Sequence, residues 1–279
     1  MRSLTLGERE IIALTDYIGP YVSLADLFPD TLPEQWAPYR ARYPEAFAPD
    51  APEMWRAAFT SYLVRSPGSL TLIDTGVGRD DPTASPGALM SELAACGVKP
   101  EQIATVVFTH LHSDHIGWNL TAEGAPTFPN AQYLFERAAW NALHDAAQGG
   151  DAYAAQASER LHALEALGVT RQFIAGRDLA EGCVSLSTDG HAPGHISVVV
   201  ESRAGRALIV GDAFLHPAQV DEPEWASSYD EDAERARTTR GLLLDLAESD
   251  GLTLAVSHIP PDGFGRVIRE GGARHWQTI

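Results

Sequence analysis

Residues 109–119 read THLHSDHIGWN and hold three of the chain's ten histidines, together with an aspartate, within positions 110–115. The stretch follows residues 103–109 (IATVVFT), a short apolar run rich in β-branched residues that predicts a buried strand. Alternate residues at a strand end project to the same side, and the turn that follows can bring later donors to the same place. The candidate donors are His110, His112, Asp114 and His115. Nitrogen and oxygen donors at this spacing suit a borderline metal ion such as Zn²⁺.

Three further candidate donors occur later in the chain, each just after an apolar run. They are His191 in DGHAPGH, Asp212 in VGDA and His258 in SHIP. Ligands collect at strand ends in layered α/β folds, so the three side chains are expected to approach the first motif. The donors within positions 110–115 are too few to hold two metal ions, and these later donors could supply the remaining ligands.

Two strand-rich halves, each followed by helices, organise the rest of the chain. In the first half, residues 61–74 predict a hairpin with a Pro-Gly turn, and residues 132–135 a further strand. In the second half, strands are expected at 185–189, 197–201, 207–210 and 252–256, and helices in the chain near 88–96, 137–147 and 230–249. Residues 20–60 are rich in proline and aromatic residues, which allows two interpretations. In the first, they form an irregular segment packed against the rest of the protein. In the second, they form a lid or dimer arm that lines an apolar pocket.

Composition excludes some function classes. The chain has 38 acidic and 20 basic residues, a net charge of −18, which argues against nucleic acid as a partner. Its N-terminus lacks a signal-peptide pattern, and no apolar run reaches the ~18 residues of a membrane helix. Cys96 and Cys183 form no short-spaced pair, so a thiolate zinc site is not expected. We therefore expect a cytoplasmic protein with two reduced thiols and no membrane partner.

The series THLHSDH, GHAPGH, GDA and a late SH resembles the metallo-β-lactamase superfamily, from about Ser61 to Arg266. The resemblance implies an α+β fold, an αββα sandwich in which two mixed sheets face each other and helices lie outside. It implies one domain over residues 1–279, with residues 1–60 as an N-terminal extension. It also implies a dinuclear metal site at one edge of the sandwich.

The same resemblance assigns a role to each donor. His110, His112 and His191 would hold one metal, Asp114, His115 and His258 the other, and Asp212 would bridge them. The cofactors would be two divalent ions, zinc before iron, manganese or cobalt, and a hydroxide between them would attack the substrate. Asp114 and Asp212 would be the catalytic carboxylates, with Asp114 helping the leaving alkoxide to take a proton. Asp74 and His195 would orient the ligands from behind.

Within the superfamily, the C-terminal pattern HPAQVDEPEW and SHIPPDGFGRV resembles the branch of acyl-homoserine lactonases and methyl parathion hydrolase-like enzymes. The first hypothesis is a quorum-quenching hydrolase that opens N-acyl-homoserine lactones. Leu215 stands where many such lactonases carry a tyrosine, which adds weight to an organophosphate or aryl-ester hydrolase. A single-iron redox protein on the same fold is the third hypothesis.

The substrate is expected to be a small lipophilic ester or lactone in an apolar pocket beside the metals. Side chains that closely follow the metal-binding motifs are the candidates for its walls. These candidates are Trp118, Asn119, Phe214, Leu215, His216 and Phe264. The resemblance and the aromatic N-terminal segment also suggest a homodimer.

Overall fold

The computed structural model describes residues 2–79 and 87–279. Within these ranges, eight strands form one sheet and seven form a second. The first sheet contains β1 (Ser3–Leu6), β2 (Arg9–Ser23), β3 (Phe47–Ala48), β4 (Ala51–Ser66), β5 (Ser69–Ile73), β6 (Thr105–Val107), β7 (Gln132–Glu136) and β8 (Thr170–Phe173). The second contains β9 (Asp178–Ala180), β10 (Cys183–Ser187), β11 (Ile196–Ser202), β12 (Gly205–Ile209), β13 (Thr253–Ala255), β14 (Phe264–Glu270) and β15 (Ala273–Thr278).

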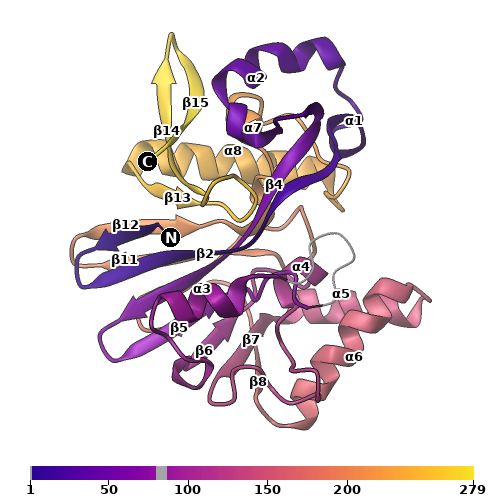
Figure 1. Ribbon diagram of the computed structural model, residues 1–279, viewed down its shortest axis with the longest axis vertical. Helices are drawn as coiled ribbons and strands as arrows, with labels where there is room; N and C mark the ends of the chain where they lie inside the picture. The colour runs from indigo at the N-terminus through magenta and orange to yellow at the C-terminus, as the bar shows by residue number, and fades with distance from the viewer. Residues whose placement is uncertain (1, 80–86) are drawn as a thin grey trace.

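Both sheets are mixed, as the resemblance implies. The first has the order β1-β2-β4-β5-β6-β7-β8, with β3 paired to β4 outside this path, and β5 to β8 run parallel. The second has the order β15-β14-β13-β12-β11-β10-β9, in which β12 and β13 run parallel. Figure 1 shows the two sheets face to face, with helices on the outer side of each.

Helices cover the outer face of each sheet. The first sheet is covered by α3 (Leu89–Ala95), α5 (Arg137–Gln148) and α6 (Ala152–Ala166). The second is covered by α8 (Ala233–Asp250), and α7 (Ala218–Asp221) packs against β15. α1 (Leu24–Leu27) and α2 (Ala37–Arg42) belong to the same apolar cluster, where α1 packs against β2 and β4. The short helix α4 (Ser113–Ile116) lies at one edge of the sandwich, and 3₁₀ turns occur at Pro33–Trp36, Pro44–Ala46, Pro100–Gln102 and Gly211–Ala213. No helix in the described ranges is long and apolar enough to cross a membrane.

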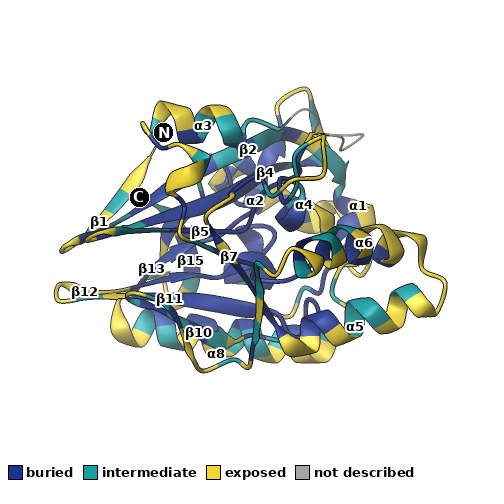
Figure 2. Cartoon of the chain, turned by 90° about the horizontal axis from the view of Figure 1, so that it is seen from below, coloured by how far each residue is buried: buried dark blue, intermediate teal, exposed yellow. Residues whose placement is uncertain are grey.

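Adjacent residues of the central strands pack into different layers, because successive side chains of a strand point to opposite faces. In β2, Ile11 lies between the sheets, whereas Ile12 packs outward with the residues of α3 and α6. In β12, Ile209 lies between the sheets, whereas Leu208 packs outward with α8. Both faces of each sheet are therefore buried, as the dark strands between partly exposed helices in Figure 2 show. Burial on both faces explains why central strands such as β6 and β12 contain continuous apolar runs.

Most of the strands and helices next to the candidate site were predicted correctly from the sequence. The hairpin at residues 61–74 is confirmed as β4 and β5, which pair on either side of a turn with Gly68 at φ 81°. The strand at 103–109 is confirmed as β6 but ends at Val107, because Phe108 and the residues after it turn toward the metal-binding loop. The helix expected from residue 230 begins at Ala233, because the Asp232 side chain caps it by accepting a hydrogen bond from the Arg235 backbone.

The expectation for residues 1–60 needs correction. β2 and β4 pair over most of their length, from Glu10 with Arg65 to Ser23 with Met54. Residues 3–6, 9–23, 47–48 and 51–60 therefore belong to strands of the first sheet, so this part of the chain is not a separate extension. The stretch between these strands is also more regular than expected, with α1, α2 and two 3₁₀ turns.

Candidate metal centre

The seven predicted donors meet at one edge of the sandwich, each in a segment that follows a strand. Those of the first motif lie in the loop after β6 and in α4, and the others follow β10, β12 and β13. The donors form two groups in which the ligand atoms lie within 4.8 Å of one another. One group is His110, His112 and His191, and the other is Asp114, His115, Asp212 and His258.

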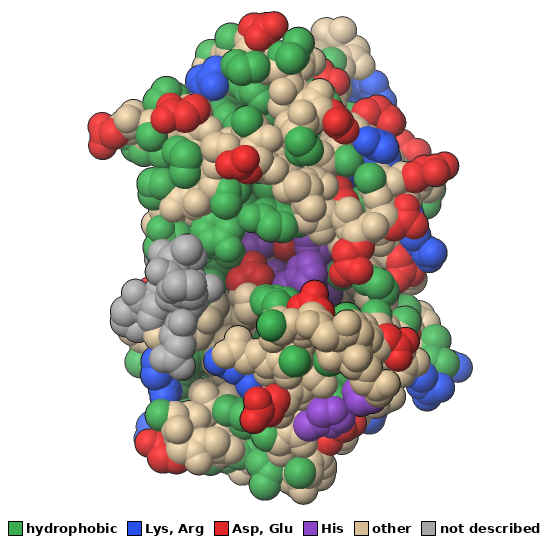
Figure 3. Space-filling model, turned by 90° about the vertical axis from the view of Figure 1, so that its right-hand side faces the viewer, with side chains coloured by type: hydrophobic (Ala, Val, Ile, Leu, Met, Phe, Trp, Pro, Cys, Tyr) green, Lys and Arg blue, Asp and Glu red, His purple; other side chains and the backbone are tan. Residues whose placement is uncertain are grey.

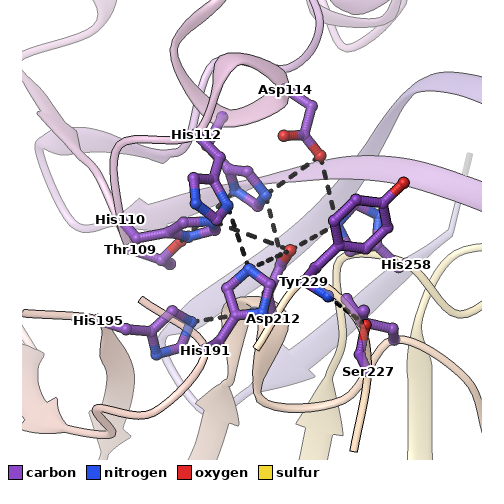
Figure 4. A network of polar contacts seen from close by, with 12 residues as sticks. Thr109, His110, His112, Asp114, His191, His195, Asp212, Ser227, Tyr229 and His258 are labelled. Carbon is purple, nitrogen blue, oxygen red and sulfur yellow. Dashed lines mark hydrogen bonds and ion pairs between the residues drawn. The ribbon is translucent and has the colours of Figure 1, made fainter. Parts of the chain in front are cut away.

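Asp212 lies between the two groups and contacts both (Figure 4). Its Oδ2 is 2.9 Å from Nε2 of His258, 3.4 Å from Nε2 of His191 and 3.9 Å from Nε2 of His110. Its Oδ1 is 3.2 Å from Nε2 of His115. The carboxylate therefore lies where it could bind an ion held by either group.

Hydrogen bonds at the far ring nitrogen fix the orientation of the histidines in the second group. Nδ1 of His115 lies 2.8 Å from Oδ2 of Asp74, and the same carboxylate accepts bonds from the backbone and hydroxyl of Thr109. Nδ1 of His258 donates to the carbonyl oxygen of Ala58 at 2.8 Å. Each bond leaves Nε2 directed into the centre, which is how a metal-binding imidazole is usually oriented.

Asp230 supports the first group in the same way. Its Oδ1 is 3.3 Å from Nδ1 of His191, and its Oδ2 accepts hydrogen bonds from Arg240 and from the backbone of Ser227. The sequence analysis missed this residue, which lies in an acidic loop without a recognisable motif. The side chains of Asp230 and Arg240 are almost completely buried, which makes their ion pair part of the centre's framework.

His195 holds Asp212 from behind, in keeping with the expectation that it orients a ligand. Its Nε2 accepts a hydrogen bond from the Asp212 backbone at 3.1 Å, and its Nδ1 donates to the carbonyl oxygen of Thr188 at 3.0 Å. Burial lowers the pKa of His195 to about 3, so the ring stays neutral and keeps this tautomer.

The donor set fits divalent cations. Nε2 of His110, Nε2 of His115 and Oδ1 of Asp212 are buried and make no well-formed hydrogen bond in the described part of the chain, although the last two atoms lie 3.2 Å apart. Buried polar atoms without partners are rare in folded proteins, and here they converge on the same space. Imidazole and carboxylate donors without thiolate suit zinc, iron, manganese or cobalt.

The charge at the centre also favours a cation. Burial opposes the charged form of His115, but Asp212, Asp114 and Asp74 outweigh burial and hold the pKa of His115 well above its usual value. Burial likewise acts to raise the pKa of Asp114, but His115 and His258 lower it to about 2. The pKa of Asp212 is lowered as well, so Asp114 and Asp212 stay ionised and create a negative potential that attracts positive charge.

A cavity of about 250 Å³ opens over this centre. Figure 3 shows histidine and acidic side chains at the bottom of the hollow and hydrophobic side chains beside it. Apart from metal donors, its walls are formed mainly by Tyr21, Trp55, Phe59, Tyr153, Leu215 and Tyr229. Three of these come from residues 20–60, where Tyr21 lies in β2 and Trp55 and Phe59 lie in β4.

Most of the predicted pocket residues lie elsewhere. Leu215 lines the cavity, but Phe214 and His216 are buried in the core over the second sheet, where His216 packs against Trp36. Phe264 packs between the sheets against Tyr62. These residues were expected to line the pocket because they follow predicted metal ligands closely in the sequence. The expectation was wrong for Phe214, His216 and Phe264, because the chain turns into the core after those ligands.

Trp118 and Asn119 are also buried outside the cavity. The indole of Trp118 donates to the carboxylate of Asp16, and the side-chain oxygen of Asn119 accepts from the hydroxyl of Thr75. Both residues therefore anchor the loop that carries the first motif and do not form a wall of the pocket.

This combination of fold and donor set defines a class of protein. The chain belongs to the Metallo-beta-lactamase superfamily, whose family model matches residues 60–258. Metallo-beta-lactamase domain-containing protein 1 of Mus musculus is 33% identical over 219 residues, covering 78% of this chain and 68% of that protein. The resemblance found in the sequence is thus confirmed.

Two solved structures share the fold over nearly the whole chain. The hydrolase AbOPH of the beta lactamase superfamily has a TM-score of 0.87 and 26% identity, covering 99% of this chain and 96% of its own. AidC, a dizinc quorum-quenching lactonase in complex with a product, N-hexanoyl-L-homoserine, has a TM-score of 0.86 and 21% identity, covering 100% and 97%. Family, fold and donor clusters together support a metal-dependent hydrolase.

Proposed function

We propose that this protein is a dinuclear-metal hydrolase that opens lactones, with N-acyl-homoserine lactones as the first substrate class. The observation that carries the proposal is the position of Asp212 between two donor groups at the base of a largely apolar cavity. Divalent cations bound there would supply Lewis-acid activation of water and of the scissile carbonyl. The structural similarity to AidC supports a lactone as the substrate.

The chain's own residues would position the substrate and move the proton. Asp114 lines the cavity, and about a fifth of its side chain is exposed (19%), so a bound substrate can reach its carboxylate. Against the effect of burial, His115 and His258 lower the pKa of Asp114 to about 2, so this carboxylate is ionised at neutral pH. From its place beside the donors it could pass a proton from the attacking water to the leaving alkoxide. The apolar wall of Trp55, Phe59 and Leu215 would hold the acyl chain and exclude bulk water.

An aryl phosphotriester or aryl ester is the second candidate substrate. Two features favour it, the apolar side chain of Leu215 in the cavity wall and the aromatic cluster beside the donor His258. In that cluster, Tyr21 meets Trp55 and Phe59 edge-on, with ring centroids 5.9 and 5.0 Å apart. Such a wall offers edge and face contacts to a substrate ring.

The decisive experiment compares kcat/KM for a long-chain N-acyl-homoserine lactone with kcat/KM for an aryl phosphotriester, on zinc-loaded protein. A ratio far above one, with a lactone value of about 10⁴ M⁻¹s⁻¹ or more, would support the proposal. A ratio far below one would assign the protein to the second class. Feeble rates on both would reject both substrates. Metal-stripped protein is the control.

A further inference from the structure

Tyr229 is placed to contact a substrate bound over the metal centre. It lies in the loop between α7 and α8, lines the cavity together with Asp114, Asp212 and His258, and is 41% exposed. In Figure 4 its ring is drawn in front of His258, and its hydroxyl points away from Asp212. Within the described ranges its hydroxyl has no hydrogen-bond partner, so it is available to a ligand.

The backbone that carries Tyr229 is fixed on both sides. The Tyr229 amide donates to the hydroxyl of Ser227 at 3.0 Å, and the next residue, Asp230, is held by His191 and Arg240. The amide of Glu231 then donates to the carbonyl oxygen of His191 at 3.0 Å. The backbone of Tyr229 is therefore attached to the same framework that orients a metal ligand.

The local charge keeps this phenol a hydrogen-bond donor. Partial burial, together with the negative charges of Asp114 and Asp26, raises the pKa of Tyr229. The hydroxyl thus remains protonated at neutral pH. Of the other phenols that line the cavity, Tyr153 already accepts a hydrogen bond from the backbone of Ser113, and Tyr21 packs edge-on against Trp55 and Phe59.

We propose that Tyr229 donates a hydrogen bond to the carbonyl oxygen of the substrate and stabilises the negative charge that develops on this oxygen. The proposal rests on the function proposed above. Leu215, in the wall of the same cavity, offers no such donor. A preorganised donor of this kind acts mainly on the transition state, so its removal should lower kcat more than it raises KM.

The test is Tyr229→Phe, which removes one oxygen atom and keeps the ring. With an N-acyl-homoserine lactone, we expect kcat/KM to fall about 10- to 100-fold, mostly through kcat, while the bound metal stays unchanged. Binding of the ring-opened product, measured calorimetrically, should also weaken. Tyr17→Phe is the matched control, because the Tyr17 hydroxyl bonds to Pro20 and does not line the cavity.

The outcomes separate this proposal from the proposed function. If the unmodified protein opens lactones and Tyr229→Phe opens them equally fast, the role of Tyr229 is refuted and the function stands. If Tyr229→Phe loses metal in proportion to rate, the residue supports the metal centre and the proposal is also refuted. If the unmodified protein opens no lactone, the proposed function fails and the assignment of Tyr229 fails with it.

Discussion

Asp230 lies directly behind His191, with its Oδ1 3.3 Å from the ring Nδ1. Its other oxygen is 3.1 Å from Nη1 of Arg240, a residue of α8, and both side chains of this pair are 1% exposed. A chain of three buried groups therefore connects the outer helix of the second sheet to a predicted metal ligand. Disturbing Asp230 should affect both metal binding and stability.

Asp230→Asn tests this connection. The change keeps the shape of the side chain but leaves Arg240 buried without a counter-charge, which should cost about 3–5 kcal/mol of unfolding free energy. Weaker support of His191 should reduce metal affinity about 10- to 100-fold, measured by competition with a chelator. Glu270→Gln is the control, because its ion pair with Arg42 is exposed and should matter little. Unchanged metal affinity in Asp230→Asn would contradict the role assigned to Asp230.

Asp212→Ala tests the bridging position. The carboxylate contacts donors of both groups, so its loss should reduce the metal content from about two ions per chain to about one or fewer. Activity should fall with the metal. Elemental analysis of the purified protein measures the change, and Asp30→Ala at an exposed position is the control. A variant that kept both ions and the full rate would refute the assignment.

Asp16→Ala tests the anchor of the metal-binding loop. The Asp16 carboxylate accepts hydrogen bonds from the backbone of Val77 at 2.7 Å, the backbone of Leu89 at 2.5 Å and the indole of Trp118. Removing it leaves several buried donors unpaired, which should cost about 3 kcal/mol or more. Urea unfolding would measure the loss. A loss below about 0.5 kcal/mol, the size expected for an exposed site, would contradict the anchoring role.

His216 should make stability depend on pH. Burial lowers its pKa to about 3, whereas an unfolded chain has a histidine pKa of about 6.5. Below pH ~6.5 the unfolded chain therefore binds a proton that the folded chain does not, and stability falls by up to about 1.4 kcal/mol per pH unit until pH ~3. Above pH ~6.5 this contribution is constant.

The measurement compares unfolding free energies of the unmodified protein and His216→Asn over a series of pH values. We expect the stability advantage of the unmodified protein to shrink by about 2 kcal/mol between neutral pH and pH 5. The metal centre is common to both proteins, so its own titration cancels in the difference. Parallel pH curves would show that the buried ring does not stay neutral.

The sequence predicted the donor set because each donor follows an apolar strand, and strand ends gather at one edge of the sandwich. It could not predict the cavity wall in the same way. Tyr21, Trp55 and Phe59 reach the cavity through the pairing of two long strands, whose register depends on contacts across the sheet. Register shifts near Thr15 and Pro20 further obscure the strand pattern there.

The residues that orient the donors through hydrogen bonds could be predicted only in part from the sequence. Asp74 and His195 lie within short motifs next to the donors and were identified. Asp230 contacts a histidine 39 residues away, and its partner Arg240 is on a different element, so no local pattern marks the pair. Tyr229 is likewise a single residue in a loop, and tertiary structure alone brings it to the cavity.

The distribution of donors along the chain has a consequence for folding. Asp212 meets His115, which is 97 positions earlier, and His258, which is 46 positions later, so contacts of large sequence separation must form before the donors converge. Forming such contacts has a large cost in loop-closure entropy, so they generally form slowly. Neither half of the chain alone can therefore assemble the full donor set. During refolding, tight uptake of both ions should occur late and report that the two sheets have docked.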